Sequence, residues 1–144
     1  MPQLEERQLL PYTPEQLFNL VIDVESYPQF LPWCRAARVL ERSENDMLAE
    51  LVISFAHVTE SYVSKVSWQE PESIHVELVK GPFHHLTNHW IFTPAVSGTE
   101  IDFSVDFAFK SKILDKMIGG YFTKASQKMI SAFRARAEAL YNAK

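Results

Sequence analysis

The stretch that decides the fold of this chain reads EIDFSVDFAF over residues 100–109. Apolar and polar side chains alternate along it, and this period of two is typical of a β-strand with one buried and one solvent-facing side. The side chains expected on the buried side are Ile101, Phe103, Val105, Phe107 and Phe109. The segment therefore predicts an antiparallel sheet with one wet face and one apolar face that another element must cover.

The pattern becomes helical after Lys110 and stays so to the end of the chain. A helix of about 30 residues is roughly 45 Å long at 1.5 Å per residue, which is enough to cross a small domain. Its predicted apolar face carries Leu114, Ile118, Tyr121, Phe122, Ala125, Met129, Ala132, Phe133 and Leu140. Its predicted opposite face carries Lys112, Lys116, Lys124, Lys128 and Arg134. This helix is the only predicted element long enough to cover the apolar face of the sheet.

The rest of the chain completes an α+β domain. Thr13, Pro14 and Gln16 have the spacing of an N-cap, a first-turn proline and a capping-box glutamine, which predicts a helix from Pro14 to about Ile22. A second short helical turn is expected around residues 23–27. Strands are expected at residues 3–10, 35–43, 47–57, 59–69, 73–80, 84–93 and 99–109. The prediction is a single domain over residues 1–144, in which a curved antiparallel sheet wraps a long C-terminal helix and leaves a space beside it.

Composition and charge narrow the classes of function. The 144 residues are 47% apolar and include one cysteine, which excludes a disordered chain and a disulfide-stapled mini-protein. Residues 1–109 hold 6 basic and 16 acidic groups, whereas residues 110–144 hold 8 basic and 2 acidic groups. The basic end either meets an anionic partner or packs on the acidic side of its own domain. The chain starts without a signal peptide and has no run of about 18 apolar residues, so the cytoplasm is the expected compartment.

No catalytic or metal-binding motif is present in the sequence. The sequence contains a histidine cluster, His84, His85 and His89, in which His85 and His89 would share a face and could bind zinc if the segment were a helix. On the predicted strand His85 and His89 are about 13 Å apart, and the sequence predicts no metal site there. Cys34 has no base near it in the sequence, so a buried structural thiol is expected.

Polar residues on predicted apolar faces are the better lead to a binding site, because burying them is costly without partners. Glu60 and Ser64 share a strand face with Tyr62, and Asn88 shares one with Trp90, while Arg136 falls within the apolar face of the last helix. These four polar groups either hold the head of a ligand in an apolar pocket or are satisfied locally. Local satisfaction would come from a turn to solvent or, for Arg136, from an ion pair with Glu60.

Several segments together resemble one family, the coenzyme Q-binding START-like proteins, a group that includes the bacterial ribosome association toxins. The segments are LPY at 10–12, LF at 17–18, DV at 23–24, YPQFLPWC at 27–34, GPF at 81–83, WIFTP at 90–94 and DFAF at 106–109. The resemblance covers essentially the whole chain. It implies a helix-grip fold around a hydrophobic tunnel, no catalytic residues, and a polyprenyl quinone such as ubiquinone as the bound ligand rather than as a required cofactor.

The resemblance and the residue patterns define the expected site. Residues 27–33 either line the tunnel mouth or form a rigid connector that fills the core. The ligand-binding residues expected are Tyr27, Phe30, Trp33, Glu60, Tyr62, Ser64, Asn88, Trp90, Phe122 and Arg136. The residues expected to contact a membrane or a ribosome are Lys112, Lys116, Lys124 and Lys128. The leading hypothesis is a lipid chaperone that supports respiration at the inner face of the membrane.

Two rival hypotheses come from other classes of protein. The first is a toxin-like regulator that binds the large ribosomal subunit through the basic helix and blocks subunit association. The second is an enzyme similar to the polyketide cyclases of the wider superfamily, for which Glu60 is the only candidate acid or base.

Overall fold

The computed structural model describes the backbone of residues 3–31, 33–55 and 58–141, and within these it leaves out the side chains of residues 3–4, 55, 58 and 118–126. The elements, in chain order, are β1 (Gln3–Leu10), α1 (Pro14–Ile22), the 3-10 helix η1 (Val24–Gln29), β2 (Cys34–Arg42), β3 (Asp46–Phe55), β4 (Val58–Gln69), β5 (Ser73–Lys80), β6 (Phe83–Ala95), β7 (Gly98–Phe109) and α2 (Lys112–Tyr141). The predicted order and type of the elements are confirmed.

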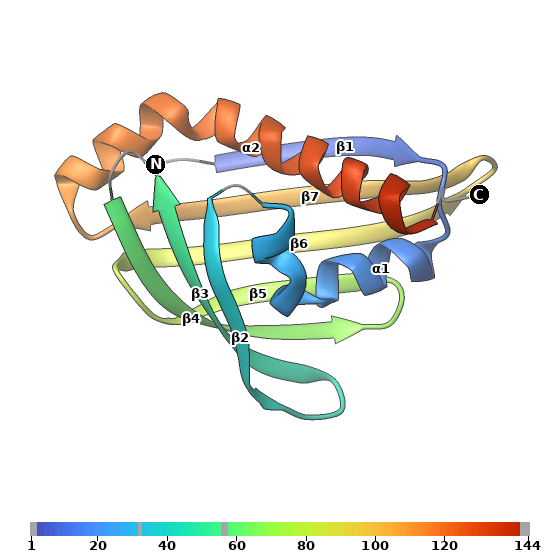
Figure 1. The fold of residues 1–144 in the computed structure, drawn as a ribbon, viewed down its shortest axis with the longest axis horizontal. Helices are drawn as coiled ribbons and strands as arrows, with labels where there is room; N and C mark the ends of the chain where they lie inside the picture. Colours follow the sequence, from blue (N-terminus) through green and yellow to red (C-terminus); the bar gives the residue numbers. More distant parts are fainter. Residues whose placement is uncertain (1–2, 32, 56–57, 142–144) are drawn as a thin grey trace.

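The seven strands form one antiparallel sheet in the order β1-β7-β6-β5-β4-β3-β2. The sheet curves, α2 lies along its concave side, and α1 and η1 cover the end of that side near the C-terminus of α2 (Figure 1). Register shifts interrupt β2 twice, the β4–β5 ladder at Val63/Ser64 and the β6–β7 ladder at Phe83/His85. Such irregularities bend strands, which suits a sheet that must wrap a helix. The fold is the expected α+β helix grip.

Helix α1 begins as its sequence predicts. The Thr13 side chain accepts a hydrogen bond from the Gln16 backbone N–H at 3.1 Å, and the Gln16 side chain accepts one from the Thr13 N–H at 2.9 Å. This capping box satisfies two donors that would otherwise lack partners at the helix start. The buried face of α1 consists of Leu17, Phe18, Leu20 and Val21. The cap therefore fixes where α1 starts and which face it turns to the sheet.

The last turns of α2 differ from the projected helical face. Leu140 was expected on the apolar face but is 48% exposed, whereas Ala137 is fully buried. The reason is that this end of α2 packs against α1 as well as the sheet: the Tyr141 hydroxyl donates to the Gln16 carbonyl at 3.0 Å. Because α2 contacts both α1 and the sheet here, the side of the helix that is buried differs from the side that its sequence period predicts. Among the described residues, no helix is long and apolar enough to cross a membrane.

The β6–β7 turn is pressed against the end of β1. A Cβ atom added at Gly98, where φ is +150°, would lie 2.0 Å from the carbonyl oxygen of Leu10. Next to it, the buried Thr99 hydroxyl donates to the Tyr12 carbonyl at 2.7 Å. Because Gly98 has no side chain, the β6–β7 turn can pack directly against the β1–α1 connection.

We predict that Gly98→Ala destabilises the protein by about 2–4 kcal/mol, because the backbone of one of the two segments must move. Urea unfolding followed by circular dichroism measures the change. The matched control is Ser97→Ala at the exposed neighbouring position, which should stay within about 0.5 kcal/mol of the parent. Equal stabilities for the two variants would contradict the close contact.

Candidate functional site

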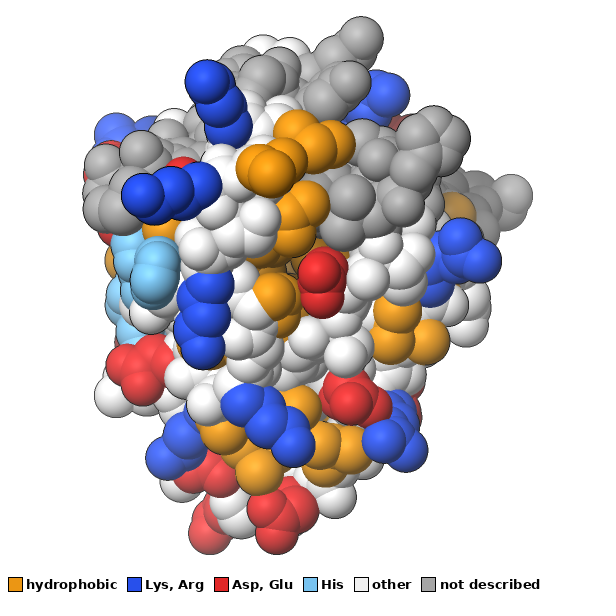
Figure 2. Space-filling model, turned by 90° about the vertical axis from the view of Figure 1, so that its left-hand side faces the viewer, with side chains coloured by type: hydrophobic (Ala, Val, Ile, Leu, Met, Phe, Trp, Pro, Cys, Tyr) orange, Lys and Arg blue, Asp and Glu red, His pale blue; other side chains and the backbone are white. Residues whose placement is uncertain are grey.

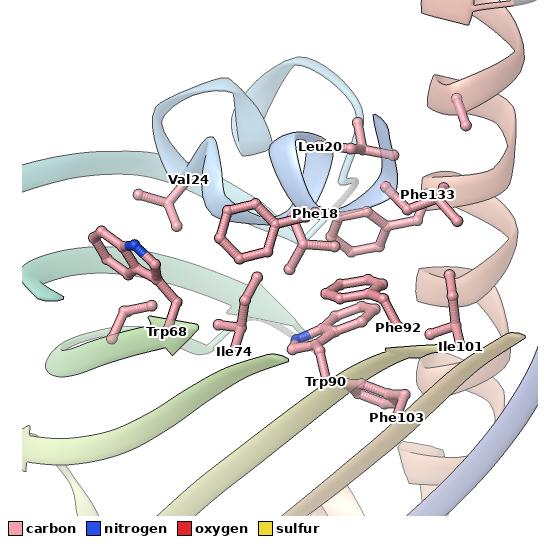
Figure 3. Packing of buried hydrophobic residues seen from close by; sticks show 14 of the residues in the cluster. Phe18, Leu20, Val24, Trp68, Ile74, Trp90, Phe92, Ile101, Phe103 and Phe133 are labelled. Atoms are coloured by element: carbon pink, nitrogen blue, oxygen red, sulfur yellow. The ribbon is translucent and has the colours of Figure 1, made fainter. Parts of the chain in front are cut away.

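The concave side of the sheet carries two apolar clusters, and the larger one lies under α1 and the C-terminal half of α2. Figure 3 shows its centre, which combines Trp90, Phe92, Ile101 and Phe103 from the sheet, Phe18 and Leu20 from α1, and Phe133 from α2. The Trp90 ring lies 4.5 Å from Phe103 and 5.2 Å from Phe133, measured between centroids. This end of the concave side is therefore filled by the protein's own side chains.

The aromatic residues of the η1 connection belong to this filled end. Tyr27 and Phe30 each pack edge-on against Phe133, at 5.6 Å and 5.2 Å between ring centroids. The Tyr27 hydroxyl donates to the Val21 carbonyl, and burial raises the pKa of Tyr27 well above its ordinary value. Trp33 is half-buried, and its carbonyl accepts a hydrogen bond from the Ser54 N–H at 2.8 Å. The contacts of Tyr27 and Phe30 are those of a rigid connector, and a role at a tunnel mouth stays a prediction.

The smaller cluster lies at the other end, where α2 begins. Its buried members are Phe83, Leu86 and Phe109, and the partly buried residues packed on them are Ile53, Tyr62, Leu78, Val105, Phe107 and Leu114. Figure 2 shows this end of the molecule, with a hollow that has hydrophobic side chains on its walls and one acidic side chain beside it. The apolar surface here is less completely covered than at the α1 end.

Two hydroxyl groups point from β4 to the concave side near this cluster. Tyr62 is half-buried and packs edge-on against Phe83 at 5.4 Å, and Ser64 is only 1% exposed. Neither hydroxyl makes a hydrogen bond to another described residue. Burial raises the pKa of Tyr62, so its phenol stays protonated and can donate. A Cβ atom at Gly81 would lie 2.6 Å from the Tyr62 Cβ, so the β5–β6 turn closes directly against this side chain.

The other predicted polar groups are spread along the concave side rather than gathered. The Asn88 amide donates to the Ser104 carbonyl at 2.8 Å and accepts from the Trp90 indole at 2.9 Å, so the protein itself satisfies it. Arg136 donates to the Gln29 side chain at 3.1 Å, beside the connector. Glu60 is half-buried in the first part of β4, at the opposite end of the molecule from the end of α2 (Figure 1).

Arg136 and Glu60 therefore do not form the ion pair that the sequence analysis considered as an alternative. The guanidinium of Arg136 lies 5.3 Å from the centre of the Phe30 ring, and its buried Nε has no partner among the described residues. The side chains of Phe122 and Lys124 lie outside the described residues. We call the end of the concave side at the smaller cluster, where α2 begins, the open end. Of the predicted ligand-binding residues, Tyr62 and Ser64 lie together at this end, and Glu60 lies earlier on the same face of β4.

Comparison with known proteins identifies the family. The model of a family described as polyketide cyclase / dehydrase and lipid transport matches residues 10–134. The chain belongs to this family.

Individual relatives agree over nearly the whole length. Ribosome association toxin RatA of Rickettsia prowazekii is 43% identical over 142 residues, which make up 96% of this chain and 97% of that protein. Coenzyme Q-binding protein COQ10 homolog B of Xenopus laevis is 32% identical over 144 residues, covering 96% of this chain and 59% of that protein. The solution structure of an 18 kDa protein from Caulobacter crescentus is 38% identical with a TM-score of 0.81, and covers 99% of this chain and 100% of that one. The resemblance to coenzyme Q-binding START-like proteins is confirmed.

The basic residues of α2 that the structure describes are on the surface of this START-like domain. Lys112, Lys116 and Lys128 are all exposed, as predicted. Two apolar side chains next to the first two lysines are also exposed, Ile113 at 75% and Met117 at 36%. The first turns of α2, at the open end, therefore present lysines and apolar side chains together.

The cysteine is buried and the three histidines lie on a strand, as the sequence predicts. Cys34 is buried, and burial raises the pKa of its thiol. His84, His85 and His89 all lie on β6, and His85 pairs with Asp106 at 2.9 Å. Among the described residues, no three His, Cys, Asp or Glu side chains converge on a common metal position. His89 has a partner that the sequence did not indicate, His75 of β5.

We predict that Phe133→Ala destabilises the protein by about 3–5 kcal/mol, because it leaves a cavity between the connector and Trp90. Leu140→Ala is the control, since both residues were expected on the same apolar face but only Phe133 is buried. The control should change the free energy of unfolding by less than about 0.5 kcal/mol. Thermal or urea unfolding decides between them, and a loss of similar size in both variants would argue against the observed packing of α2.

Proposed function

We propose that this protein binds an isoprenoid lipid, with ubiquinone as the specific ligand, on the concave side of the sheet at the open end. The observation that carries the proposal is the position of two hydroxyls of β4, Tyr62 and Ser64, beside the smaller apolar cluster, where neither makes a hydrogen bond to another described residue. Two hydroxyl donors beside an apolar cluster suit a ligand that is largely apolar and carries acceptor oxygens. The carbonyl oxygens of a quinone ring are acceptors of this kind.

The surroundings of the two hydroxyls suit the rest of such a ligand. The smaller cluster leaves six hydrophobic residues only partly buried, among them Val105, Phe107 and Leu114. Covering them would remove further apolar surface from water, at about 25 cal/mol per Å². The names of the relatives agree with this class of ligand, since one is a coenzyme Q-binding protein and the family description includes lipid transport.

Head-group contacts decide whether such a protein can compete with a membrane. Each buried CH₂ group is worth about 0.8 kcal/mol against water, but an isoprenoid tail in a bilayer is already in an apolar medium. Moving the tail into the protein therefore gains little. Specific hydrogen bonds from Tyr62 and Ser64 would supply the difference, and this gives the two hydroxyls more weight than the many apolar residues around them.

The proposed role is that of a carrier and not of an enzyme. The curated relatives are named as a toxin and a binding protein, whereas the family description also covers cyclases and dehydrases. Glu60 remains the one side chain proposed as an acid or base if a reaction occurs. Glu60→Gln with unchanged ligand binding and no change in the chemistry of the bound lipid would remove the enzyme hypothesis.

Lipid extraction followed by mass spectrometry tests the proposal directly. We expect an isoprenoid quinone in the purified protein, and uptake of added ubiquinone by protein from which lipid has been removed. Tyr62→Phe and Ser64→Ala should each weaken binding about threefold to tenfold, the usual contribution of one hydrogen bond. Quenching of tryptophan fluorescence by a short-chain ubiquinone measures the affinity.

Ser61→Ala is the matched control for Ser64→Ala, because Ser61 is exposed on the other face of β4. Its affinity should equal that of the parent, and all three variants should unfold cooperatively. A protein without extractable isoprenoid that also fails to take up quinone would refute the function. Normal uptake in Tyr62→Phe and Ser64→Ala would instead refute only the assignment of the head-group site.

Delivery of a lipid also requires contact with a membrane, and we propose that the start of α2 makes it. Lys112 and Lys116 are exposed there beside Ile113 and Met117. The lysines could contact anionic head groups of a bilayer while the two apolar side chains contact its upper acyl region. Each basic side chain near an anionic surface contributes about 1 kcal/mol. We therefore place the protein in the cytoplasm, with reversible contact at the inner face of the membrane.

Flotation with vesicles that contain anionic phospholipid tests this contact. Lys112→Ala/Lys116→Ala should weaken vesicle binding about thirtyfold, which corresponds to the loss of two basic contacts. Lys128→Ala/Arg134→Ala removes the same charge from the later turns of α2 and should change binding much less. Equal losses in both double variants would point to general charge attraction and would overturn the proposed orientation.

Ribosome association is the second candidate function, because a relative 43% identical to this chain is named a ribosome association toxin. The basic residues of α2 would be the contact, but residues 1–109 carry a net charge of −10 and would repel RNA. Co-sedimentation with large ribosomal subunits over a series of salt concentrations distinguishes the candidates. Phosphate-mediated binding weakens steeply with salt, and binding that is absent even at low salt would remove this candidate.

A further inference from the structure

A histidine pair lies on the outer, convex face of the sheet, away from the proposed lipid site. His75 of β5 and His89 of β6 are direct partners in the antiparallel register. Nδ1 of His75 is 3.0 Å from Nε2 and 3.1 Å from Nδ1 of His89, and the centres of the two rings are 4.2 Å apart. Both side chains have access to solvent, since His89 is exposed and the His75 side chain is 33% exposed. Two imidazole nitrogens are thus held together at the surface by the pairing of two central strands.

The separation of these nitrogens is close to that of two ligands on one metal ion. Two imidazole nitrogens at 2.0–2.1 Å from a tetrahedral Zn²⁺ ion are about 3.3 Å apart, and a narrower angle at the metal brings them nearer to 3 Å. The observed 3.0 Å therefore needs only side-chain rotation and no change of backbone. The ladder between β5 and β6 already provides the preorganisation that a chelate requires.

A carboxylate holds the first of these rings from its other side. Oε1 of Glu77 lies 2.8 Å from Nε2 of His75, the nitrogen that does not face His89. Carboxylates in this position orient the imidazole ring of metal-binding histidines and make it a better ligand. Lys65 is the register partner of Glu77 on β4 and adds a positive charge, while the partner of His89 on β7 is the uncharged Ser104.

We propose that His75 and His89 form a two-histidine site for a divalent first-row transition ion such as Zn²⁺, with Glu77 as the residue that orients His75. Water or a group from a binding partner completes the coordination, because the described residues offer no third ligand. Neutral imidazole favours Zn²⁺, Ni²⁺ and Cu²⁺ over Mg²⁺ and Ca²⁺. The site is independent of the lipid proposal, since its residues face the opposite side of the sheet.

Equilibrium titration of the whole protein with Zn²⁺ alone, and separately with Ni²⁺, tests this site. We expect one ion per chain and no binding of Mg²⁺. A bound ion also links β5 to β6, so the unfolding temperature should rise with the metal concentration. His75→Gln and His89→Gln should each abolish the saturable binding and the rise in unfolding temperature.

His84→Gln is the matched control, because His84 is exposed on the same strand and has no part in the pair. It should bind the ion with parental affinity. Glu77→Gln should bind about tenfold to a hundredfold more weakly while keeping one ion per chain, the effect expected of an orienting residue. Parental binding in either His75→Gln or His89→Gln, or no saturable binding of Zn²⁺ or Ni²⁺ by the parent protein, would overturn the proposal.

Discussion

The structure depends on the contact of Phe133 with the aromatic side chains around it. A curved sheet with an apolar concave face must have that face covered, and α2 is the only element long enough to do so. Phe133 joins α2 to the sheet through Trp90 and to the connector through Tyr27 and Phe30. Because these contacts fill the α1 end, the remaining apolar surface is left at the end where α2 begins. The candidate site therefore lies at the end of the concave side that the aromatic core does not fill.

Much of the fold follows from patterns that are local in sequence. The alternation over residues 100–109, the capping box at Thr13 and the proline and glycine turns set the order and bounds of nearly every element. Contacts between distant segments are not encoded in this local way. Leu140 is exposed, against the expectation, because α2 meets α1 near its end, and no helical period includes that second surface.

The candidate site was predictable to the extent that it depends on strand faces. Period two correctly placed Ser64 on the buried face of β4, together with Tyr62. The period of two could not show that Asn88 is hydrogen-bonded to Trp90 and Ser104. It also could not show that Arg136 is hydrogen-bonded to Gln29. These partners depend on the register of the strands and on the placement of the helix. The pairing of His75 with His89 is not visible in the sequence for the same reason, since 14 residues separate them and the β5–β6 ladder joins them.

The contacts of the C-terminal half of α2 affect how the protein can open. Its C-terminal half is fixed by Phe133, by the Arg136–Gln29 hydrogen bond and by the Tyr141–Gln16 hydrogen bond, all at the filled end. Gly119 and Gly120 lie nearer its start, where helix propensity is lowest. Local unfolding can have a smaller free energy than global unfolding. Local unfolding of the first turns of α2 would break the hydrogen bond from the Phe109 N–H to the Asp115 carboxylate but leave the aromatic core intact, so that a large hydrophobic guest could be exchanged without loss of the native state.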